Sequence, residues 1–364
     1  MKIKEIINAV EKWAPAAYAE DFDNVGLLVG DAGREATGVL VALDTLEETV
    51  DEAVKNKCNL ILSFHPIIFK GLKKITGKSY VERVVIKAIK NDIAIYAVHT
   101  ALDNSFEGVN AGICDKLNLK NRQILVPKPK TIKKLVTFVP HENAGEVREA
   151  LFEAGAGNIG NYDRCSFNAE GKGSFNGNES SNPAVGQKGK THVEPETRID
   201  MMFPKHLENK ILNTLFKAHP YEEVAYEVDT LDNINQHIGI GMVGTLDNRV
   251  TEAEFIQNVK DKFHCGIVRH SRLKGKKIKT VAVLGGSGAF AIPNAIAAKA
   301  DIYLTGDLKY HDFFQAENQI ILADMGHYES ERFTKDLLFA FLKENFPNFA
   351  NVLSEKNTNP IQYS

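Results

Sequence analysis

Two side chains that could bind a metal ion lie four residues apart near the end of the sequence. His327 and Glu331 follow a short apolar run at 319–323 and a glycine-containing turn at 324–326. After such a turn the chain is expected to enter a helix, where residues four apart are neighbours on one face. The pair can therefore converge on one point. Imidazole and carboxylate without sulfur are ligands for Zn, Mn, Fe or Ni.

Other polar side chains with metal-binding or acid–base chemistry follow three further predicted strands. They are His65 after 59–64, His99 and Asp103 after 93–98, and Asp307 and His311 after 301–304. Ligands of α/β proteins bind beyond the carboxyl ends of the strands, so several such sets at the ends of one sheet favour a metal site. Taken singly, each histidine is better explained as a surface or hydrogen-bonded residue than as a ligand. A carboxylate such as Asp103 or Glu331 could also bridge two ions.

The turn LGGSGAF at 284–290 is open to two interpretations. Glycine-rich turns between a strand and a helix present backbone N–H groups to phosphate. This turn, however, is neither G-x-G-x-x-G nor a P-loop with its Lys-Ser/Thr pair. A tight turn that needs positive φ explains the glycines equally well, so a phosphate-bearing substrate stays one of two possibilities.

The elements that must position these residues alternate between strand and helix. In the first part of the chain, predicted strands at 38–44, 59–66 and 93–103 enclose helices at 46–58 and 80–92. The same order returns from about 236 to 350, with strands at 279–290, 301–307 and 319–327 and a helix at 329–346. This order predicts an α/β domain with a largely buried sheet, made of two separate parts of the chain.

The middle of the chain follows a different order. Strands at 133–140, 197–204 and 222–231, with helices at 143–155 and 206–219, indicate the β-α-β-β-α-β unit of ferredoxin-like folds. The Gly/Ser/Asn-rich stretch at 168–191 is predicted to be a mobile or ligand-ordered loop. The turn HPYEE (219–223) either binds a ligand or simply enters a strand, with Tyr221 and Tyr226 packing. We expect the α/β domain at 1–127 and 234–364 and the inserted domain at 128–233.

The composition is that of an ordinary globular protein. The chain has 364 residues, 43% of them hydrophobic, and a formal net charge of -3, which gives no reason to expect nucleic acid or an anionic membrane as a partner. No apolar run approaches the roughly 20 residues that span a bilayer. The first residues predict an amphipathic helix and not a signal peptide. The four cysteines lie far apart without a C-x-x-C pair, which is typical of a reducing cytoplasm.

Six motifs occur in the order found in a known family. They are EDFDNVGLLVGD (20–31), SFHPIIF (63–69), YAVHTALDNSFEGVN (96–110), LGGSGAF (284–290), YLTGDLKYHD (303–312) and ADMGHYESE (323–331). In these the chain resembles the GTP cyclohydrolase 1 type 2 homologue family, the Nif-three-like proteins, over essentially its whole length. GAGNIGNYDRCSF (155–167) and AHPYEEVAYEV (218–228) resemble the insert of the longer bacterial members.

The resemblance implies a discontinuous Nif-three-like α/β domain with a dinuclear metal centre, an inserted ferredoxin-like α+β domain similar to PII and CutA proteins, and assembly as a toroidal homohexamer. By motif match the metal ligands are His65, Asp103, His327 and Glu331. The family usually has two adjacent histidines in the second motif, and here Phe64 replaces the first. A phenyl ring cannot ligate, so the second of two ions loses a ligand, unless His311 or water replaces it.

Two functions are expected on these grounds. The first is a metal-dependent hydrolase, with one or two divalent ions (zinc first, then Mn, Fe or Ni), a nucleotide or other phosphorylated ring compound as substrate, and His99 or His311 as acid–base group or hydrogen-bond partner of the ligands. The alternative is a metal-loaded regulatory ring whose insert senses a small ligand or docks a partner. Deleting 130–232 would separate the two.

Overall fold

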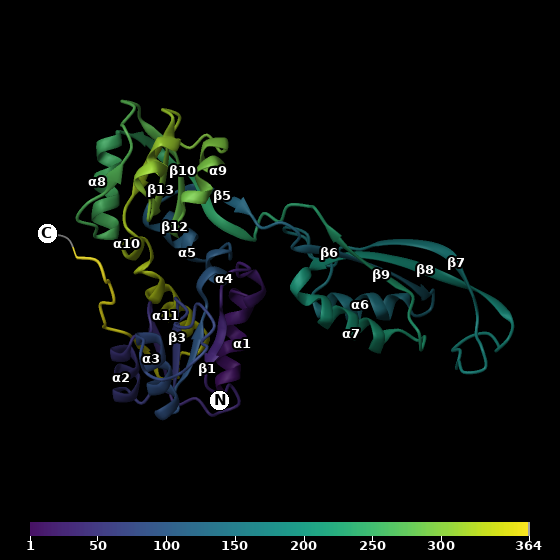
Figure 1. Cartoon of the computed structure of the whole chain (residues 1–364). Coiled ribbons are helices and arrows are strands. Elements are labelled where there is room, and N and C mark those ends of the chain that lie inside the picture. Colours follow the sequence, from purple (N-terminus) through teal and green to yellow (C-terminus); the bar gives the residue numbers. More distant parts are fainter. Residues whose placement is uncertain (363–364) are drawn as a thin grey trace. The chain divides into compact units, whose positions relative to one another are not determined.

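The computed structural model describes residues 1–362, which form two compact units. One unit combines Met1–Pro127 with the described residues from Gln236 onward, and the other is Lys128–Asn235. Figure 1 shows both, coloured along the chain. Within residues 1–362, no helix is both long enough and apolar enough to cross a membrane. Each unit is described by itself below.

The first unit contains a five-stranded sheet built mainly from the first part of the chain. Its order is β1-β4-β3-β2-β15, with β1 antiparallel to β4 and the other pairs parallel. The strands are β1 (Gly26–Val29), β2 (Val39–Ala42), β3 (Leu60–Ser63), β4 (Ala94–Ala97) and β15 (Asn351–Leu353). The three central strands are buried at every position, as expected for parallel strands covered on both faces.

Helices cover both faces of this sheet. The helices α1 (Ile3–Trp13) and α11 (Thr334–Asn345) pack on one face, and α2 (Glu47–Lys55) and α3 (Tyr80–Lys90) pack on the other. The predicted amphipathic helix at the N-terminus is α1, whose Ile3, Ile6, Ile7 and Val10 are buried. This i, i+3, i+4, i+7 spacing gives one apolar stripe, and each such side chain contributes about 1.5–3 kcal/mol when buried.

A second, six-stranded sheet completes this unit, in the order β11-β14-β13-β12-β10-β5. The strands are β5 (Lys120–Pro127), β10 (Gly239–Val250), β11 (Arg269–His270), β12 (Ile278–Ser287), β13 (Ile302–Gly306) and β14 (Ile321–Asp324). The neighbouring pairs β12–β13 and β13–β14 are parallel, and the other neighbouring pairs are antiparallel. The helices α5 (Val109–Lys116) and α8 (Glu252–Phe263) pack on one face, and α9 (Ile292–Ala297) packs on the other.

The predicted strand ends therefore belong to two sheets and not to one. Each part of the chain builds its own sheet and also lends a strand to the other: β5 pairs with β10, and β15 pairs with β2. One apolar cluster runs continuously through both sheets, since it contains Val39 and Leu60 of the first sheet and Val281 and Leu304 of the second.

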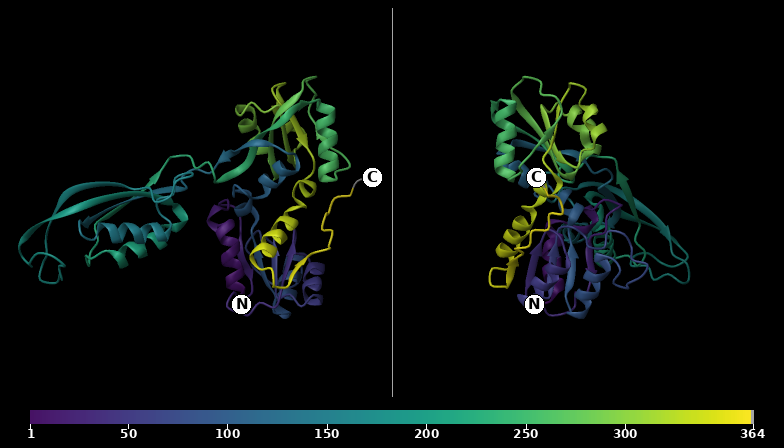
Figure 2. Two further views of the ribbon diagram at one scale, coloured as in Figure 1. Left: turned by 180° about the vertical axis from the view of Figure 1, so that it is seen from behind. Right: turned by 60° about the vertical axis from the view of Figure 1, so that its left-hand side comes forward.

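The second unit is a four-stranded antiparallel sheet with two helices on one face. Its elements are β6 (Ile132–Pro140), α6 (Ala144–Ala154), β7 (Phe167–Asn176), β8 (Thr191–Pro204), α7 (Glu208–Ala218) and β9 (Tyr226–Leu231), and the sheet order is β7-β8-β6-β9. Figures 1 and 2 show α6 and α7 side by side on the same side of the sheet. They bury a separate core that includes Leu135, Ile199 and Phe203.

The prediction of a loop at 168–191 is wrong for the first part of this segment. Residues Phe167–Asn176 form β7, which pairs residue by residue with β8 from Asp200 back to Thr191. Glycines at 171 and 173 hide the alternation expected of a strand, and the long partner strand supplies the hydrogen bonds that local sequence does not predict. Only residues 177–190 remain outside the two strands.

Candidate metal centre

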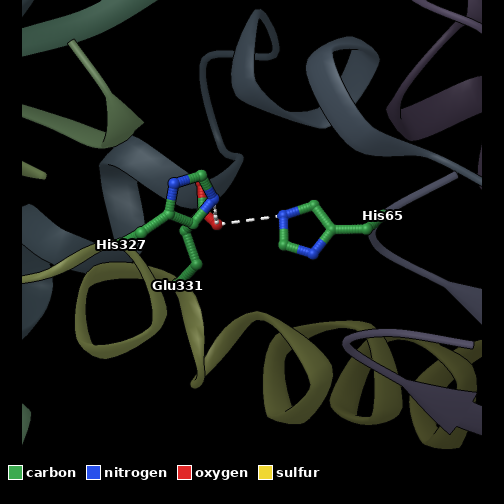
Figure 3. Close-up of side chains that lie close together, drawn as sticks. All are labelled: His65, His327 and Glu331. Carbon is green, nitrogen blue, oxygen red and sulfur yellow. Dashed lines mark hydrogen bonds and ion pairs between the residues drawn. The ribbon is translucent and has the colours of Figure 1, made fainter. Parts of the chain in front are cut away.

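Three predicted ligands converge where the carboxyl ends of the two parallel strand sets meet. His65 lies just after β3, and α10 (His327–Glu331) begins just after β14. Nε2 of His65 lies 3.1 Å from Oε2 of Glu331, and Nε2 of His327 lies 3.0 Å from the same oxygen (Figure 3). The three donor atoms are within 4.8 Å of one another, and Glu331 is only 3% exposed. This is the donor set and spacing of a divalent cation site.

Each histidine of this cluster is held from behind by a carboxylate. Nδ1 of His65 lies 2.7 Å from Oδ1 of Asp44, and Nδ1 of His327 lies 2.7 Å from Oδ2 of Asp307. Asp44 follows β2 and Asp307 follows β13, so both sit at strand ends of the same two sets. A carboxylate on Nδ1 fixes the ring and leaves Nε2 as the donor atom, as in carboxylate–histidine–metal arrangements.

These contacts shift the protonation of the cluster. Burial lowers the pKa of His65, but the hydrogen bonds with Asp44 and Glu331 outweigh it and raise the pKa to about 10. Burial likewise opposes the hydrogen bonds of His327 with Asp307 and Glu331, which raise its pKa to about 11. Burial favours the neutral form of Glu331, yet the two histidines hold its pKa below the ordinary value. Without an ion, charged imidazoles thus compensate the buried carboxylate.

Asp103 is a buried carboxylate close enough to this cluster to be affected by the charges of Glu331, His65 and His327. It ends α4 (His99–Asp103), the short helix after β4, and is 5% exposed. Its Oδ1 accepts no hydrogen bond from residues 1–362. Burial and the negative charge of Glu331 raise its pKa well above the ordinary value. A buried carboxylate lacking a partner is costly, so this orphaned oxygen fits a bound cation nearby.

The glycine-rich turn lies directly against Glu331. Gly286 has φ +69°, and a Cβ there would meet Oε1 of Glu331 at 2.3 Å. The N–H of Gly285 donates to Oδ1 of Asn110 and that of Gly286 donates to Oγ of Ser330. These two donors are therefore used inside the protein. Positive φ and close approach to the carboxylate explain the glycines better than phosphate binding does.

His99 and Phe64 form a second layer around His65. Nδ1 of His99 lies 2.8 Å from Oδ1 of Asp23, and its ring centroid lies 5.3 Å from that of His65. Burial opposes this pairing, but His99 lowers the pKa of Asp23 to about 2. The backbone of His99 has φ +26°, a conformation that L residues rarely adopt. Phe64 is fully buried, with its centroid 4.9 Å from the ring of His65.

His311 lies elsewhere, on an exposed part of the 3-10 helix η4 (Tyr310–Ala316). Its ring packs against Tyr310 and Phe314, with centroid distances of 5.1 and 6.0 Å. The structure thus brings His65, His327 and Glu331 together, places Asp103 and His99 next to them, and leaves His311 outside the cluster.

The roles of the two carboxylates behind the histidines were not predicted from the sequence. Asp44 ends a predicted strand and Asp307 was recognised only as a polar strand-end residue. The rule that polar residues gather at carboxyl ends of strands applies to both, so that signal was present. The sequence does not indicate which carboxylate contacts which ring, because the two partners of each pair follow different strands.

A cavity of about 600 Å³ adjoins the centre. Asp307 belongs to both, since it contacts His327 and lines the cavity. The other lining residues are Arg269, Ser287, Ala289, Phe290, Leu308, Lys309 and Asp312. Phe290 is 59% exposed, and Asp324 forms an ion pair with Arg269. The cavity thus combines an exposed aromatic ring with two cationic side chains.

Comparisons with known proteins find matches that cover nearly the whole chain. A family model described as Duf34/NIF3 (NGG1p interacting factor 3) matches residues 1–360. A Bacillus subtilis protein named GTP cyclohydrolase 1 type 2 homolog is 38% identical, with 99% of this chain and 98% of the relative covered. A Staphylococcus aureus protein of the same name is 34% identical over the full length of both.

Solved structures give the same picture. A Bacillus cereus protein related to NIF3 superimposes with a TM-score of 0.85 and 36% identity, covering 100% of this chain and 99% of that one. A Staphylococcus aureus protein, SA1388, superimposes with a TM-score of 0.78 and 31% identity at the same coverage.

Proposed function

Because the chain belongs to the Duf34/NIF3 family, we propose that it is a metal-dependent hydrolase that acts on a nucleotide or another phosphorylated ring compound. The observation that carries this proposal is the convergence of both Nε2 atoms on one oxygen of Glu331, with a carboxylate behind each ring. When bound there, a divalent ion supplies Lewis acidity and lowers the pKa of a water towards neutrality. Zinc suits this donor set best, and Mn, Fe or Ni are the alternatives.

The chain's own residues have distinct roles in this proposal. His65, His327 and Glu331 hold the ion, and Asp103 supplies a further carboxylate next to it. Asp44 and Asp307 orient the imidazoles. His99, held by Asp23, faces the ring of His65 at a centroid distance of 5.3 Å and is the candidate for moving a proton. His311 lies outside the cluster and has no role in it.

The substrate class is supported by the adjoining cavity. Phe290 offers an exposed ring on which a planar base can stack, and Lys309 offers positive charge to a phosphate, whereas Arg269 is already paired with Asp324. Ser287 donates a hydrogen bond to Asp307 at 2.5 Å and so links the cavity to the carboxylate behind His327.

Metal content tests the centre itself. We expect about one ion per chain in protein purified without chelators, and loss of that ion in a His327→Ala/Glu331→Ala double variant. Phe64→His, which restores a second imidazole beside His65, should raise the content towards two. Elemental analysis of the three proteins side by side decides this. Metal that persists in the double variant would place the ion elsewhere.

Activity tests the reaction. Metal-replete and chelator-treated protein should be compared on a panel of nucleotides and phosphoesters, with release of product followed by chromatography. Turnover is expected only with metal, and the double variant should be inactive. No turnover of any compound by fully loaded protein would reject the hydrolase proposal while leaving the metal site intact.

We propose further that residues 128–233 form a ferredoxin-like domain of the PII/CutA type, inserted into the metal-binding domain at 1–127 and 234–364. The support is the sheet order β7-β8-β6-β9 with both helices on one face.

By family resemblance we also propose a cytoplasmic toroidal homohexamer. The four cysteines are free, as a reducing compartment requires. Light scattering on the purified chain tests the assembly.

A further inference from the structure

A second cavity, of about 920 Å³, lies in the second unit, on the sheet face that the helices do not cover. Along β8, Glu196 and Arg198 line the cavity, whereas Ile199 and Met201 point the other way into the core. This alternation is that of an ordinary strand with one face on a core and the other open. The volume lies within the range of small-molecule sites.

A loop and a turn beside the sheet also line this cavity, and backbone hydrogen bonds hold them in place. Residues of the loop 177–190 and of the turn 221–225 form its walls. The backbone N–H of Asn182 in the loop donates to Oε1 of Glu222 in the turn at 2.5 Å. The base of the loop is closed by the N–H of Gly189, which donates to the carbonyl of Gly177 at 2.7 Å.

A carboxylate lies at the bottom of this cavity among aromatic rings. Glu196 is 8% exposed and accepts a hydrogen bond from the hydroxyl of Tyr221 at 2.9 Å. Phe138, Phe175 and Tyr221 line the cavity, and the last two rings meet edge to face at 5.9 Å. A Cβ at Gly173 would meet Oε2 of Glu196 at 2.0 Å, so this glycine makes room for the carboxylate.

Negatively charged side chains outnumber positively charged ones in the lining of this cavity. The negative side chains are Glu170, Glu196, Glu222 and Glu223, and the positive ones are Lys172 and Arg198. Arg198 is already neutralised by Asp200, through contacts of 2.8 and 3.0 Å. The remaining excess is negative, and its buried member, Glu196, is the one that contacts Tyr221.

We propose that this cavity binds a small organic cation, an amine with an apolar body. The ammonium group would donate to Glu196, and the body would lie between Phe138, Phe175 and Tyr221. A cation near a carboxylate gains a charge-assisted hydrogen bond, and the faces of aromatic rings attract it further. This site is separate from the metal centre and does not depend on the hydrolase proposal.

Three probes of one shape and different charge test the proposal on the full-length chain: 2-phenylethylamine, 2-phenylethanol and phenylacetate. Saturable binding, followed by ligand-observed NMR, is expected for the amine alone. Glu196→Gln keeps an acceptor for Tyr221 but removes the charge, and should weaken amine binding about tenfold or more. Gly171→Leu should also weaken amine binding, because Gly171 pairs with Glu196 across the strands and a side chain there, whose Cβ meets nothing within 4 Å, would occupy the space beside the carboxylate.

Matched controls keep the result interpretable. Gly145→Leu and Glu146→Gln change the same residue types on the exposed surface of α6 and should leave amine binding unchanged. Repeating the titration in the His327→Ala/Glu331→Ala background reveals any amine held by the metal centre. Equal binding of all three probes, no saturable binding of the amine, or binding that is indifferent to both cavity variants would each overturn the proposal.

Discussion

Nε2 of His65 and Nε2 of His327 both contact Oε2 of Glu331, and each imidazole is in turn held by its own aspartate. Because Asp44 and Asp307 contact Nδ1, they decide ring orientation and tautomer without being ligands themselves. Substitutions of Asp44 or Asp307 can therefore lower the metal affinity while every proposed ligand is kept.

Replacing either orienting carboxylate should weaken metal binding without abolishing it. For Asp44→Asn and for Asp307→Asn we expect a 10- to 100-fold lower affinity, about the usual effect of such partners. Competition against a chromogenic chelator measures this. Asp51→Asn is the control, since Asp51 forms only an exposed ion pair with Lys87. An unchanged affinity in both variants would show that the rings are held by packing alone.

His219 makes the second unit sensitive to acid. Its Nε2 donates to the carbonyl of Phe138 at 2.9 Å, and its Nδ1 accepts from the N–H of Tyr221 at 3.1 Å, so the folded state needs the neutral ring. Burial lowers its pKa below the ordinary value. Between pH 7 and the lowered pKa the unfolded chain therefore binds more protons, and stability falls as pH falls.

The measurement is the free energy of unfolding of the second unit at pH 7 and pH 5, read from hydrogen exchange of its amides. Wild type should lose more stability over this range than His219→Gln, whose amide can donate and accept without titrating. Identical pH dependence in the two proteins would contradict this account.

At the scale of elements, the last residues of β12 position Glu331 through the absence of a side chain. Gly286→Ala would place a Cβ at 2.3 Å from the carboxylate and strain a residue at φ +69°. We expect about 1–3 kcal/mol lower stability and reduced metal content. Gly266→Ala, where a Cβ meets nothing within 4 Å, is the control. Denaturant melts and elemental analysis give both readouts, and wild-type values for Gly286→Ala would contradict the close contact.

Elements with strong periodicity could be predicted from the sequence, and pairings between distant elements could not. The helix α1 and the buried strands β2 to β4 follow from apolar spacing alone. The exchange of β5 and β15 between sheets, and the strand β7 with its alternating glycines, depend on partners far away in the chain. Likewise His65, His327 and Glu331 were predicted as ligands, whereas Asp44 was missed because its role exists only opposite His65.

At the scale of the whole molecule, we expect that the second unit can be deleted and the two cut ends of the chain joined by a short turn. Its two ends leave the first unit from adjacent strands, because Pro127 of β5 is the pairing partner of Gly239 of β10. A short Gly-rich turn in place of residues 128–235 should therefore leave the first unit folded. We expect unchanged metal content per chain and an unchanged thermal transition of that unit, measured by elemental analysis and calorimetry. Loss of the ion would show that the two units depend on each other.

The wide separation of the ligands in the sequence has a consequence for biosynthesis. His65 and Glu331 are 266 residues apart, and β15, which follows α10, completes the sheet to which β3 belongs. A ribosome releases the chain from its N-terminus, so His65 emerges long before His327 and Glu331 are synthesised. On the proposed function, an ion held by all three residues can be captured only after α10 has been synthesised, and we expect a chain truncated before α10 not to retain it.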